Sequence, residues 1–268
     1  MTTYILSLGI LFIFVSVVFI LACYKRDNSV IDIAYGLGFL ATTYAISFYV
    51  LTLAPLPPTT TFILILITIW ALRLSYRIYR KNKGKPEDFR YAAWRTSWTT
   101  QGASYFYIRS YLQIFILQGL VISIVLLPFT QSILATQSFS GMAFVGLGIW
   151  IIGFIFESVG DAQLDRFIKS TDPDKGTIMR TGLWAYTRHP NYFGESAMWW
   201  GIACIALSGG ASIVVLASPI LITYLLLFVS GVPMLEAKWV GNKEWETYRD
   251  TTSVFIPLPS RWWKMIAK

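Results

Sequence analysis

Residues 182–200 read GLWAYTRHPNYFGESAMWW, a polar loop that runs directly into an apolar segment. The loop contains the chain's only histidine, His189, next to an arginine. Pro190 has a fixed φ and disfavours helical geometry in the residue before it, so we expect a helix to begin close to this proline. Asn191 and Glu195, four residues apart, then share a face of its first turn. Free N–H groups at a helix start favour an anionic ligand; a solvated loop with a helix cap is the simpler alternative.

The composition indicates a membrane protein. Of the 268 residues, 55% are hydrophobic and only 13% are charged, whereas about a quarter of the residues in a soluble domain are charged. The first apolar run is long enough to span a bilayer, and we interpret it as a retained helix. Cys23 and Cys204 lie in apolar runs without metal-ligand spacing, so we expect buried free thiols and no bound metal. No repeat or linker is visible, which predicts a single domain over residues 1–268.

The apolar runs predict an all-α membrane bundle of about seven transmembrane helices. Pro128 lies near the end of the fourth run and is expected to kink or shorten it. Gly209 and Gly210 leave a very tight turn between the sixth and seventh runs, which predicts a helical hairpin. Gly36 and Gly38 in the second run permit close helix contacts. The runs cover roughly residues 4–24, 30–53, 61–80, 111–135, 141–163, 192–208 and 211–231.

The charges predict the orientation of these helices. The connections at 54–60, 131–140 and 208–211 carry no charged residue. Basic loops stay in the cytoplasm, so we expect the N-terminus outside and the C-terminus inside the cell. The net charge of +8 then reflects juxtamembrane loops with affinity for anionic lipids, and it does not indicate nucleic-acid binding. All 22 lysines and arginines fall in four segments: 25–26, 73–109, 166–188 and 238–268.

Five acidic residues lie within or at the ends of the expected spans. An ionisable group at that depth is costly unless it is paired or hydrated, so these groups together predict a polar cavity that opens to the cytoplasm. The other half of the bundle lacks such groups, which disfavours an ion path through the membrane. The five are Asp32, Glu157, Asp161, Glu195 and Glu236.

Two clusters combine charge with hydrogen-bonding capacity. Lys83, Lys85 and Arg90 belong to a loop that is able to cover phosphates, although a positive-inside anchor is the simpler explanation of the cations. Glu157 and Asp161 are four residues apart, and like charges at that spacing repel. They require cations or hydroxyl donors, such as a ribose, unless they belong to an ordinary set of interfacial salt bridges.

Asp32 and Tyr35 share a face of the second expected helix. A buried carboxyl beside a phenol is able to polarise a substrate carbonyl by donating a hydrogen bond. Alternatively, Asp32 pairs with Lys25 or Arg26 where this helix begins. The aromatic and basic tail over 236–259 either forms an interfacial belt or folds under the bundle and closes a pocket.

Four segments of the chain resemble the membrane family of steroid 5-alpha-reductase-like proteins, most closely its bacterial branch, the domain of unknown function 1295. The most specific part is the block Thr-Arg-His-Pro-Asn-Tyr-Phe-Gly-Glu at 187–195. The resemblance implies a seven-helix bundle that holds NADPH on its cytoplasmic side. It also implies reduction of a carbon–carbon double bond conjugated to a carbonyl, in a steroid-like or other lipid substrate. The four segments are 72–95, 154–167, 182–201 and 230–259.

The resemblance also implies roles for individual residues. Steroid reductases carry a Gln-Glu pair on the second helix and a Tyr on the third, and these bind the enone carbonyl. The second helix here has Asp32 and Tyr35 instead, and the third has Trp70 near Arg73. We therefore expect Asp32 or Tyr35 to donate to the carbonyl oxygen. The implied cofactor-binding residues are Lys85, Glu157, Asp161, Arg188, His189, Asn191, Tyr192 and Glu195.

Two other functions fit the sequence. The pattern Arg-His-Pro-x-Tyr-x-Gly is similar to that of membrane methyltransferases that use S-adenosylmethionine to modify isoprenylcysteine or phospholipid head groups. Those enzymes usually carry a Glu-Glu pair near the end of the chain, whereas Glu236 is followed by Ala237 here. A non-enzymatic lipid or sterol-binding protein would keep the bundle without the cofactor residues. In each case we expect a multi-pass protein of the bacterial inner membrane, in contact with lipids and a hydrophobic or lipid substrate.

Overall fold

The computed structural model describes residues 2–134, 140–172 and 175–266. Every regular element within these ranges is helical, which confirms the predicted all-α membrane class. The expected connection at 131–140 and the basic segments 166–188 and 238–268 fall partly outside the described residues. Six segments are long and apolar enough to cross a membrane: Thr3–Lys25, Val30–Leu51, Pro58–Asn82, Ala103–Val125, Gly141–Lys169 and Ile213–Trp239.

The remaining expected span forms helix α9 (Pro190–Ser208). As expected, this helix begins at the proline, which places Asn191 and Glu195 in its first turns. With its 19 residues and its polar start, α9 is not among the six long apolar segments. The total of seven spans and their orientation stay predictions.

The chain divides into two compact units. Unit 1 comprises Met1–Phe139 and Ala206–Val215, and unit 2 comprises Ser140–Ile205 and Leu216–Lys268. Each unit has a cluster of polar side chains of its own: one around Asp32 in unit 1, and one around Arg188 in unit 2. The single domain that the sequence led us to expect stays a prediction.

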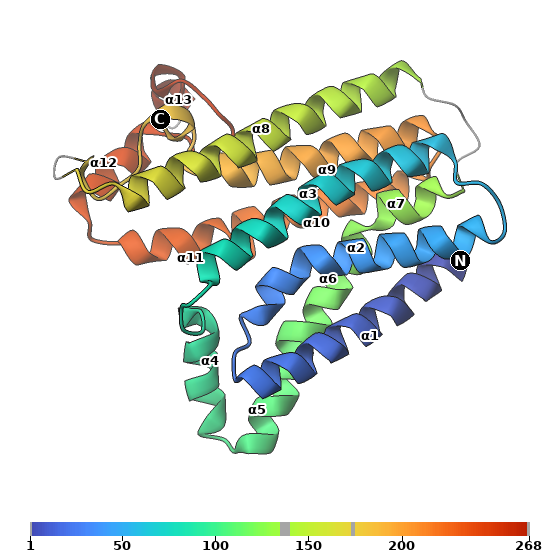
Figure 1. Cartoon of the computed structure of the whole chain (residues 1–268). Helices are drawn as coiled ribbons and strands as arrows, with labels where there is room; N and C mark the ends of the chain where they lie inside the picture. Colours follow the sequence, from blue (N-terminus) through green and yellow to red (C-terminus); the bar gives the residue numbers. More distant parts are fainter. Residues whose placement is uncertain (1, 135–139, 173–174, 267–268) are drawn as a thin grey trace. The chain divides into compact units, whose positions relative to one another are not determined.

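The first three helices of unit 1 pack in sequence order (Figure 1): α1 (Thr2–Lys25) contacts α2 (Val30–Leu51), and α2 contacts α3 (Pro58–Asn82). A Cβ on Gly36 of α2 would lie 2.7 Å from the carbonyl oxygen of Ala71 on α3. Only glycine allows backbones to approach this closely, so the predicted close helix contact at Gly36 is confirmed.

The fourth span is a continuous helical path with a π-helical middle. It begins before the predicted start at 111, because the helix extends through Arg109, where the apolar sequence pattern stops. It ends at Val125, and Pro128 falls in the first turn of the next helix, as expected for a residue that cannot continue a helix. The elements are α5 (Ala103–Ser110), η1 (Tyr111–Ile116), α6 (Leu117–Val125) and α7 (Leu127–Ser132).

In unit 2, α8 (Gly141–Lys169) and α9 lie antiparallel along a line of glycines (Figure 1). A Cβ on Gly146 would lie 2.7 Å from the carbonyl oxygen of Gly201, and one on Gly153 would lie 2.5 Å from that of Gly194. The two backbones therefore touch, which places the side chains beside these glycines directly against the neighbouring helix.

The chain turns sharply after α9. Gly210 has a φ of 90°, which favours glycine. Ser196 on α9 and Thr223 on α10 bring their hydroxyl oxygens to 2.7 Å from each other, as in the predicted hairpin. The elements after the turn are η4 (Ile213–Leu216), α10 (Ala217–Tyr224), η5 (Leu225–Val229), α11 (Val232–Glu236), η6 (Ala237–Trp239), α12 (Lys243–Thr251) and α13 (Ser260–Ile266).

Candidate functional site

Arg188, immediately before α9, binds the C-terminal part of unit 2. Its Nε donates to Oε1 of Glu236 at 2.9 Å, and its Nη2 donates to the other carboxylate oxygen at 3.4 Å. Its Nη1 donates to the backbone carbonyl oxygens of Arg249 and Thr252, at 3.0 and 2.7 Å. The backbone N–H of Arg188 donates to the carbonyl oxygen of Ser253 at 2.8 Å. All three guanidinium nitrogens are therefore engaged by the protein, and the side chain is only 7% exposed.

Tyr248 on α12 anchors the same tail. Its Oη donates to the carbonyl oxygen of Trp184 at 2.5 Å, within η3 (Gly182–Ala185). The indole of Trp184 donates in turn to the carbonyl oxygen of Gly160 on α8 at 3.0 Å. Burial raises the pKa of Tyr248 far above its ordinary value, although the charge of Arg188 opposes this, so the phenol remains a donor. Part of the tail is thus bonded to η3, which is bonded to α8. Both alternatives for this segment, an interfacial belt or the closing of a pocket, stay predictions.

His189 shares the carboxylate of Glu236. Its Nε2 lies 2.8 Å from Oε1 of Glu236, and because an ionised carboxylate only accepts, Nε2 carries the proton in this pair. The imidazole ring stacks on Tyr192 with 5.3 Å between ring centroids. Burial lowers the pKa of His189, and this outweighs the raising effect of Glu236. The ring therefore contributes a hydrogen bond and a stacking contact to the loop before α9. Its expected role in cofactor binding stays a prediction.

Buried acceptors gather where α8 meets the first turns of α9. Glu157 and Asp161 on α8 are 3% and 4% exposed. A Cβ on Gly194 would lie 2.5 Å from the backbone nitrogen of Glu157. The backbone of α8 at Glu157 therefore lies directly against α9. Oδ1 of Asn191 is buried and has no hydrogen-bond partner among the described residues. A buried acceptor without a donor costs about 1–3 kcal/mol, so this atom is where a ligand or water donor is expected.

The α8–α9 face, as we call the surface formed by Glu157, Asp161, Asn191, Tyr192 and Glu195, suits a ligand that donates hydrogen bonds. Glu195 lies one turn after Asn191, and both are half-buried, as is Tyr192. Carboxylates accept, and an amide both donates and accepts. No three His, Cys, Asp or Glu side chains are grouped to hold a metal ion in the part of the chain that the structure describes.

In unit 1, the first turn of α4 (Phe89–Thr99) brings two side chains to Asp32 on α2. Asp88 caps this helix by accepting from the backbone N–H of Arg90 at 3.0 Å. Tyr91 Oη then donates to Oδ1 of Asp32 at 2.5 Å, and Arg90 Nη2 donates to Oδ2 at 2.8 Å. Both oxygens of Asp32 therefore act as acceptors in this geometry.

The environment of this cluster keeps Tyr91 protonated. Burial raises the pKa of Tyr91 well above its ordinary value, and the neighbouring Asp32 raises it further. Burial would lower the pKa of Arg90, but Asp88 and Asp32 raise it, so the guanidinium stays charged. Tyr91 is thus a neutral donor beside a fixed ion pair.

Tyr91 is the functional candidate that the sequence analysis missed. Helical spacing in the sequence pairs Asp32 with Tyr35, but Tyr35 packs edge-to-face on Phe39, with 5.2 Å between ring centroids. The role expected of Tyr35 stays a prediction. Asp88, a good N-cap before an aromatic segment, was the signal that a helix begins here and that Tyr91 lies in its first turn.

Two further expectations concern cations near this cluster. The ion-pair partner of Asp32 is Arg90, and not the Lys25 or Arg26 of the alternative. Lys85 is exposed in the turn between α3 and α4, where Gly84 has a φ of 74°. Its role as a cofactor residue stays a prediction.

Residues 18–252 match the family described as "Protein of unknown function (DUF1295)". The chain belongs to this family. The match includes both polar clusters of this DUF1295 protein. The chain is also similar to the uncharacterized protein C594.04c of Schizosaccharomyces pombe, with 27% identity over 157 residues that cover 49% of this chain and 44% of the relative. It thus spans less than half the length of that curated relative. No solved structure matches the chain significantly.

Proposed function

We propose that this DUF1295 protein is a membrane reductase that uses NADPH to saturate a carbon–carbon double bond conjugated to a carbonyl in a lipid-like substrate. The proposal is supported by the resemblance to steroid 5-alpha-reductase-like proteins. One observation carries it: the buried Oδ1 of Asn191 has no partner among the described residues and lies on a face that also bears buried carboxylates.

The α8–α9 face fits the nucleoside part of this cofactor. Glu157 and Asp161 are suited to accept from ribose hydroxyls, and Asn191 is suited to a carboxamide because it offers both an acceptor and donors. Tyr192 and Glu195 would complete this face. When bound, NADPH would supply a hydride to the β-carbon of an enone.

Arg188 and His189 have a different part in the proposal from the one that the resemblance implies. Every guanidinium nitrogen of Arg188 is bonded within unit 2. Only one of its five N–H groups, on Nη2, has no bond there, and its charge is already paired with Glu236. We therefore assign both residues to positioning the loop before α9. Lys85 is an exposed cation that is able to contact a phosphate, and we keep it in that role.

Tyr91 is the hydrogen-bond donor that we propose for the substrate carbonyl, with Tyr35 as the alternative phenol. Asp32, which is ion-paired with Arg90 and accepts with both oxygens, has the role of positioning Tyr91. Reduction at the β-carbon places negative charge on the carbonyl oxygen, which needs a donor in a dry site. The buried phenol is protonated, and the charge of Arg90 offsets that of Asp32 beside it. Donation to a substrate would replace the bond from Tyr91 to Asp32.

A methyltransferase is the second candidate, and one observation favours it. The α8–α9 face presents carboxylates, while Arg188, three residues before Asn191, is already paired with Glu236. S-adenosylmethionine carries a ribose and a positive sulfonium but no phosphate, so such a face would suit it as well.

Binding of the two cofactors to the purified protein separates these candidates. Titration with NADPH and with S-adenosylmethionine, followed by calorimetry and by the melting temperature, is expected to give binding and stabilisation with NADPH alone. Stabilisation by S-adenosylmethionine alone would overturn the reductase proposal.

Turnover of single-hydroxyl variants tests the donor. NADPH oxidation with a 4-ene-3-ketosteroid as the enone probe is expected to fall about 10²–10³-fold in Tyr91→Phe, which is typical of losing one transition-state donor. NADPH affinity should hardly change. Tyr24→Phe is the matched control, because Tyr24 is 87% exposed in the same unit. A larger loss in Tyr35→Phe than in Tyr91→Phe would return the role to Tyr35.

A further inference from the structure

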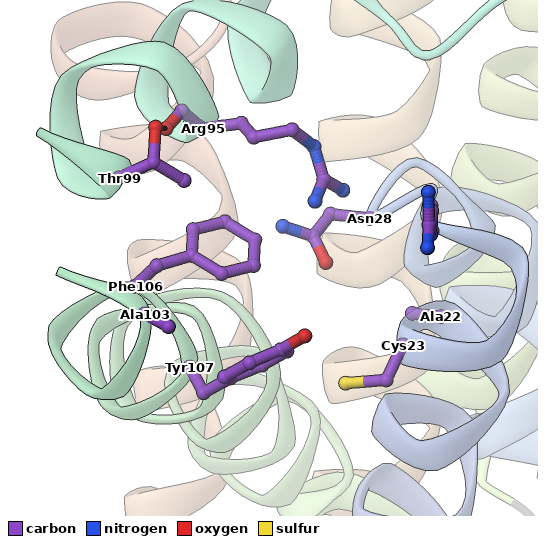
Figure 2. A pocket seen from close by; sticks show the side chains of 9 residues that line it. Ala22, Cys23, Asn28, Arg95, Thr99, Ala103, Phe106 and Tyr107 are labelled. Atoms are coloured by element: carbon purple, nitrogen blue, oxygen red, sulfur yellow. Dashed lines mark hydrogen bonds between the residues drawn. The ribbon is translucent and has the colours of Figure 1, made fainter.

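A polar cavity in unit 1 lies apart from the Asp32–Tyr91 pair. It has a volume of about 220 Å³, and α1, α4 and α5 contribute its walls. Figure 2 shows the side chains of Arg95, Asn28, Cys23 and Tyr107 around it. The remaining lining residues are Ala22, Arg26, Thr99, Ala103 and Phe106.

Two arginines give this cavity its charge. Arg95 donates from Nε and Nη2 to the two carboxylate oxygens of Glu87, both at 2.8 Å, so its charge is offset while its remaining N–H groups stay available. The side chain of Arg26 has no hydrogen-bond or ion-pair partner within the described part of the chain, and its backbone has a φ of 54°, which is uncommon for a residue other than glycine. The cavity therefore holds a cation without a counter-ion and suits an anionic group.

The cavity lies where the lipid-facing surface of α1 ends. Ile20, Leu21 and Tyr24 are 67%, 41% and 87% exposed, as expected of side chains that face lipid, and Lys25 and Arg26 follow directly. A tyrosine followed by basic residues at the end of an apolar helix is typical of the boundary between hydrocarbon and head groups. An anion at this depth belongs to a lipid head group.

A second cavity, lined by apolar residues, also lies against α1. Its volume is about 230 Å³, and the residues that line it are Leu8, Leu11, Phe12, Val15, Ile116, Gly119 and Leu120. Positions 8, 15 and 22 repeat every seven residues and so lie on one face of α1 with the polar cavity. Val15 and Ala22 are about 10 Å apart along the helix axis, which is less than the roughly 15 Å that one leaflet's acyl chains cover. Phe19 falls between Val15 and Ala22 on this helix, and its half-buried ring contacts that of Tyr111, with 4.9 Å between ring centroids.

From these two cavities we infer that unit 1 binds one anionic phospholipid, with its phosphate between Arg26 and Arg95 and an acyl chain in the apolar cavity along α1. The charge of Arg26, the depth of the polar cavity and the apolar groove on the same helix face together select a phospholipid over a free phosphate. The site is independent of the proposed reductase function, because it uses none of the residues assigned to the cofactor or the substrate carbonyl.

Thiol labelling tests this site, because Cys23 lines the polar cavity. In nanodiscs that contain phosphatidylglycerol, labelling of Cys23 by a maleimide is expected to be several-fold slower than in phosphatidylcholine alone. Labelling of Cys204, in unit 2, should be equal in both. Equal labelling of Cys23 in the two lipids would overturn the proposal. Protection by inorganic phosphate in phosphatidylcholine nanodiscs, to the extent given by phosphatidylglycerol, would overturn it as well, because the ligand would then be the free anion.

Two pairs of variants test the two ends of the lipid. Arg26→Gln is expected to weaken the phosphatidylglycerol protection about fivefold, the usual effect of one basic residue at an anionic membrane surface, whereas Lys25→Gln, next to it but outside the cavity, should change it less. Leu120→Trp fills the apolar cavity and should also reduce protection, unlike Leu112→Trp, which is exposed outside the cavity. Equal effects within both pairs would show general charge and surface effects and contradict a site.

Discussion

Each unit holds an arginine beside a carboxylate and an aromatic ring, and the two arginines are used differently. In unit 2, Arg188 is 7% exposed, and its three guanidinium nitrogens bond Glu236 and two carbonyl oxygens of the tail. In unit 1, Arg90 is 30% exposed and bonds only two carboxylates, those of Asp32 and Asp88. A buried arginine whose three nitrogens are all bonded within the protein holds structure, whereas a partly exposed arginine beside a phenol leaves N–H groups that are able to contact a ligand.

The comparison changes how the opening sequence stretch is understood. An Arg-His pair at the start of a helix favours an anionic ligand by its charge alone. Its bonds show that Arg188 and His189 hold the tail through Glu236. Among the cofactor-binding residues that the resemblance implies, Asn191 is the strongest candidate of this stretch, because its buried Oδ1 has no partner among the described residues. The roles of Arg188 and His189 at a cofactor stay predictions.

The largest expected effect comes from breaking the Arg188 cluster. Glu236→Ala leaves Arg188 buried without its carboxylate, and removing one partner of a buried ion pair costs about 3 kcal/mol. Thermal unfolding of the purified variant should show this loss of stability. Glu246→Ala is the control, because Glu246 is exposed on the neighbouring α12 and should cost about 0.5 kcal/mol or less. Equal melting temperatures for the two variants would show that the cluster does not hold the tail.

A smaller effect is expected from the second anchor of the tail. Tyr248→Phe removes the hydrogen bond that Oη donates to the carbonyl oxygen of Trp184. Because that oxygen then lacks this donor, the free energy of unfolding should fall by about 1–2 kcal/mol. Tyr186→Phe is the matched control, since its side chain is 48% exposed. If both substitutions lower the free energy of unfolding equally, the hydroxyl of Tyr248 does not anchor the tail.

The smallest effect is a pH dependence from His189. Burial lowers its pKa below the ordinary value near 6.5, so the folded protein binds fewer protons than the unfolded chain. The stability contributed by the neutral ring is complete above about pH 6.5 and is lost as the pH falls through the folded pKa. The melting temperature of the parent should therefore fall more steeply below this pH than that of His189→Gln. Parallel slopes would contradict a lowered pKa, and no other histidine is present to confuse the result.

Much of the fold could be predicted from the sequence, for physical reasons. Apolar length and composition located the spans, and the helix start at Pro190 and the break before Pro128 followed from proline geometry. The fourth span was predicted to begin and end too late, at 111 and 135 instead of Ala103 and Val125, because its helix includes Arg109 before the apolar pattern and breaks ahead of Pro128.

The sites were less predictable, because they depend on contacts between distant segments. Asp32 and Tyr91 are 59 positions apart, and Arg188 and Glu236 are 48 apart. Spacing on one helix pairs Asp32 with Tyr35, and no local pattern shows that Arg188 is already neutralised. Local signals were strongest for Glu157 and Asp161, because two carboxylates one turn apart in an apolar helix require partners.

The cofactor-binding role of Asn191 is the central claim, and titration calorimetry of NADPH against three proteins tests it most directly. The parent and Gln101→Ala, which removes an exposed amide in unit 1, should bind NADPH with the same affinity. Asn191→Ala should show no measurable binding while its circular dichroism spectrum stays that of the parent. Binding of NADPH by Asn191→Ala as tight as by the parent would contradict the assignment of the α8–α9 face.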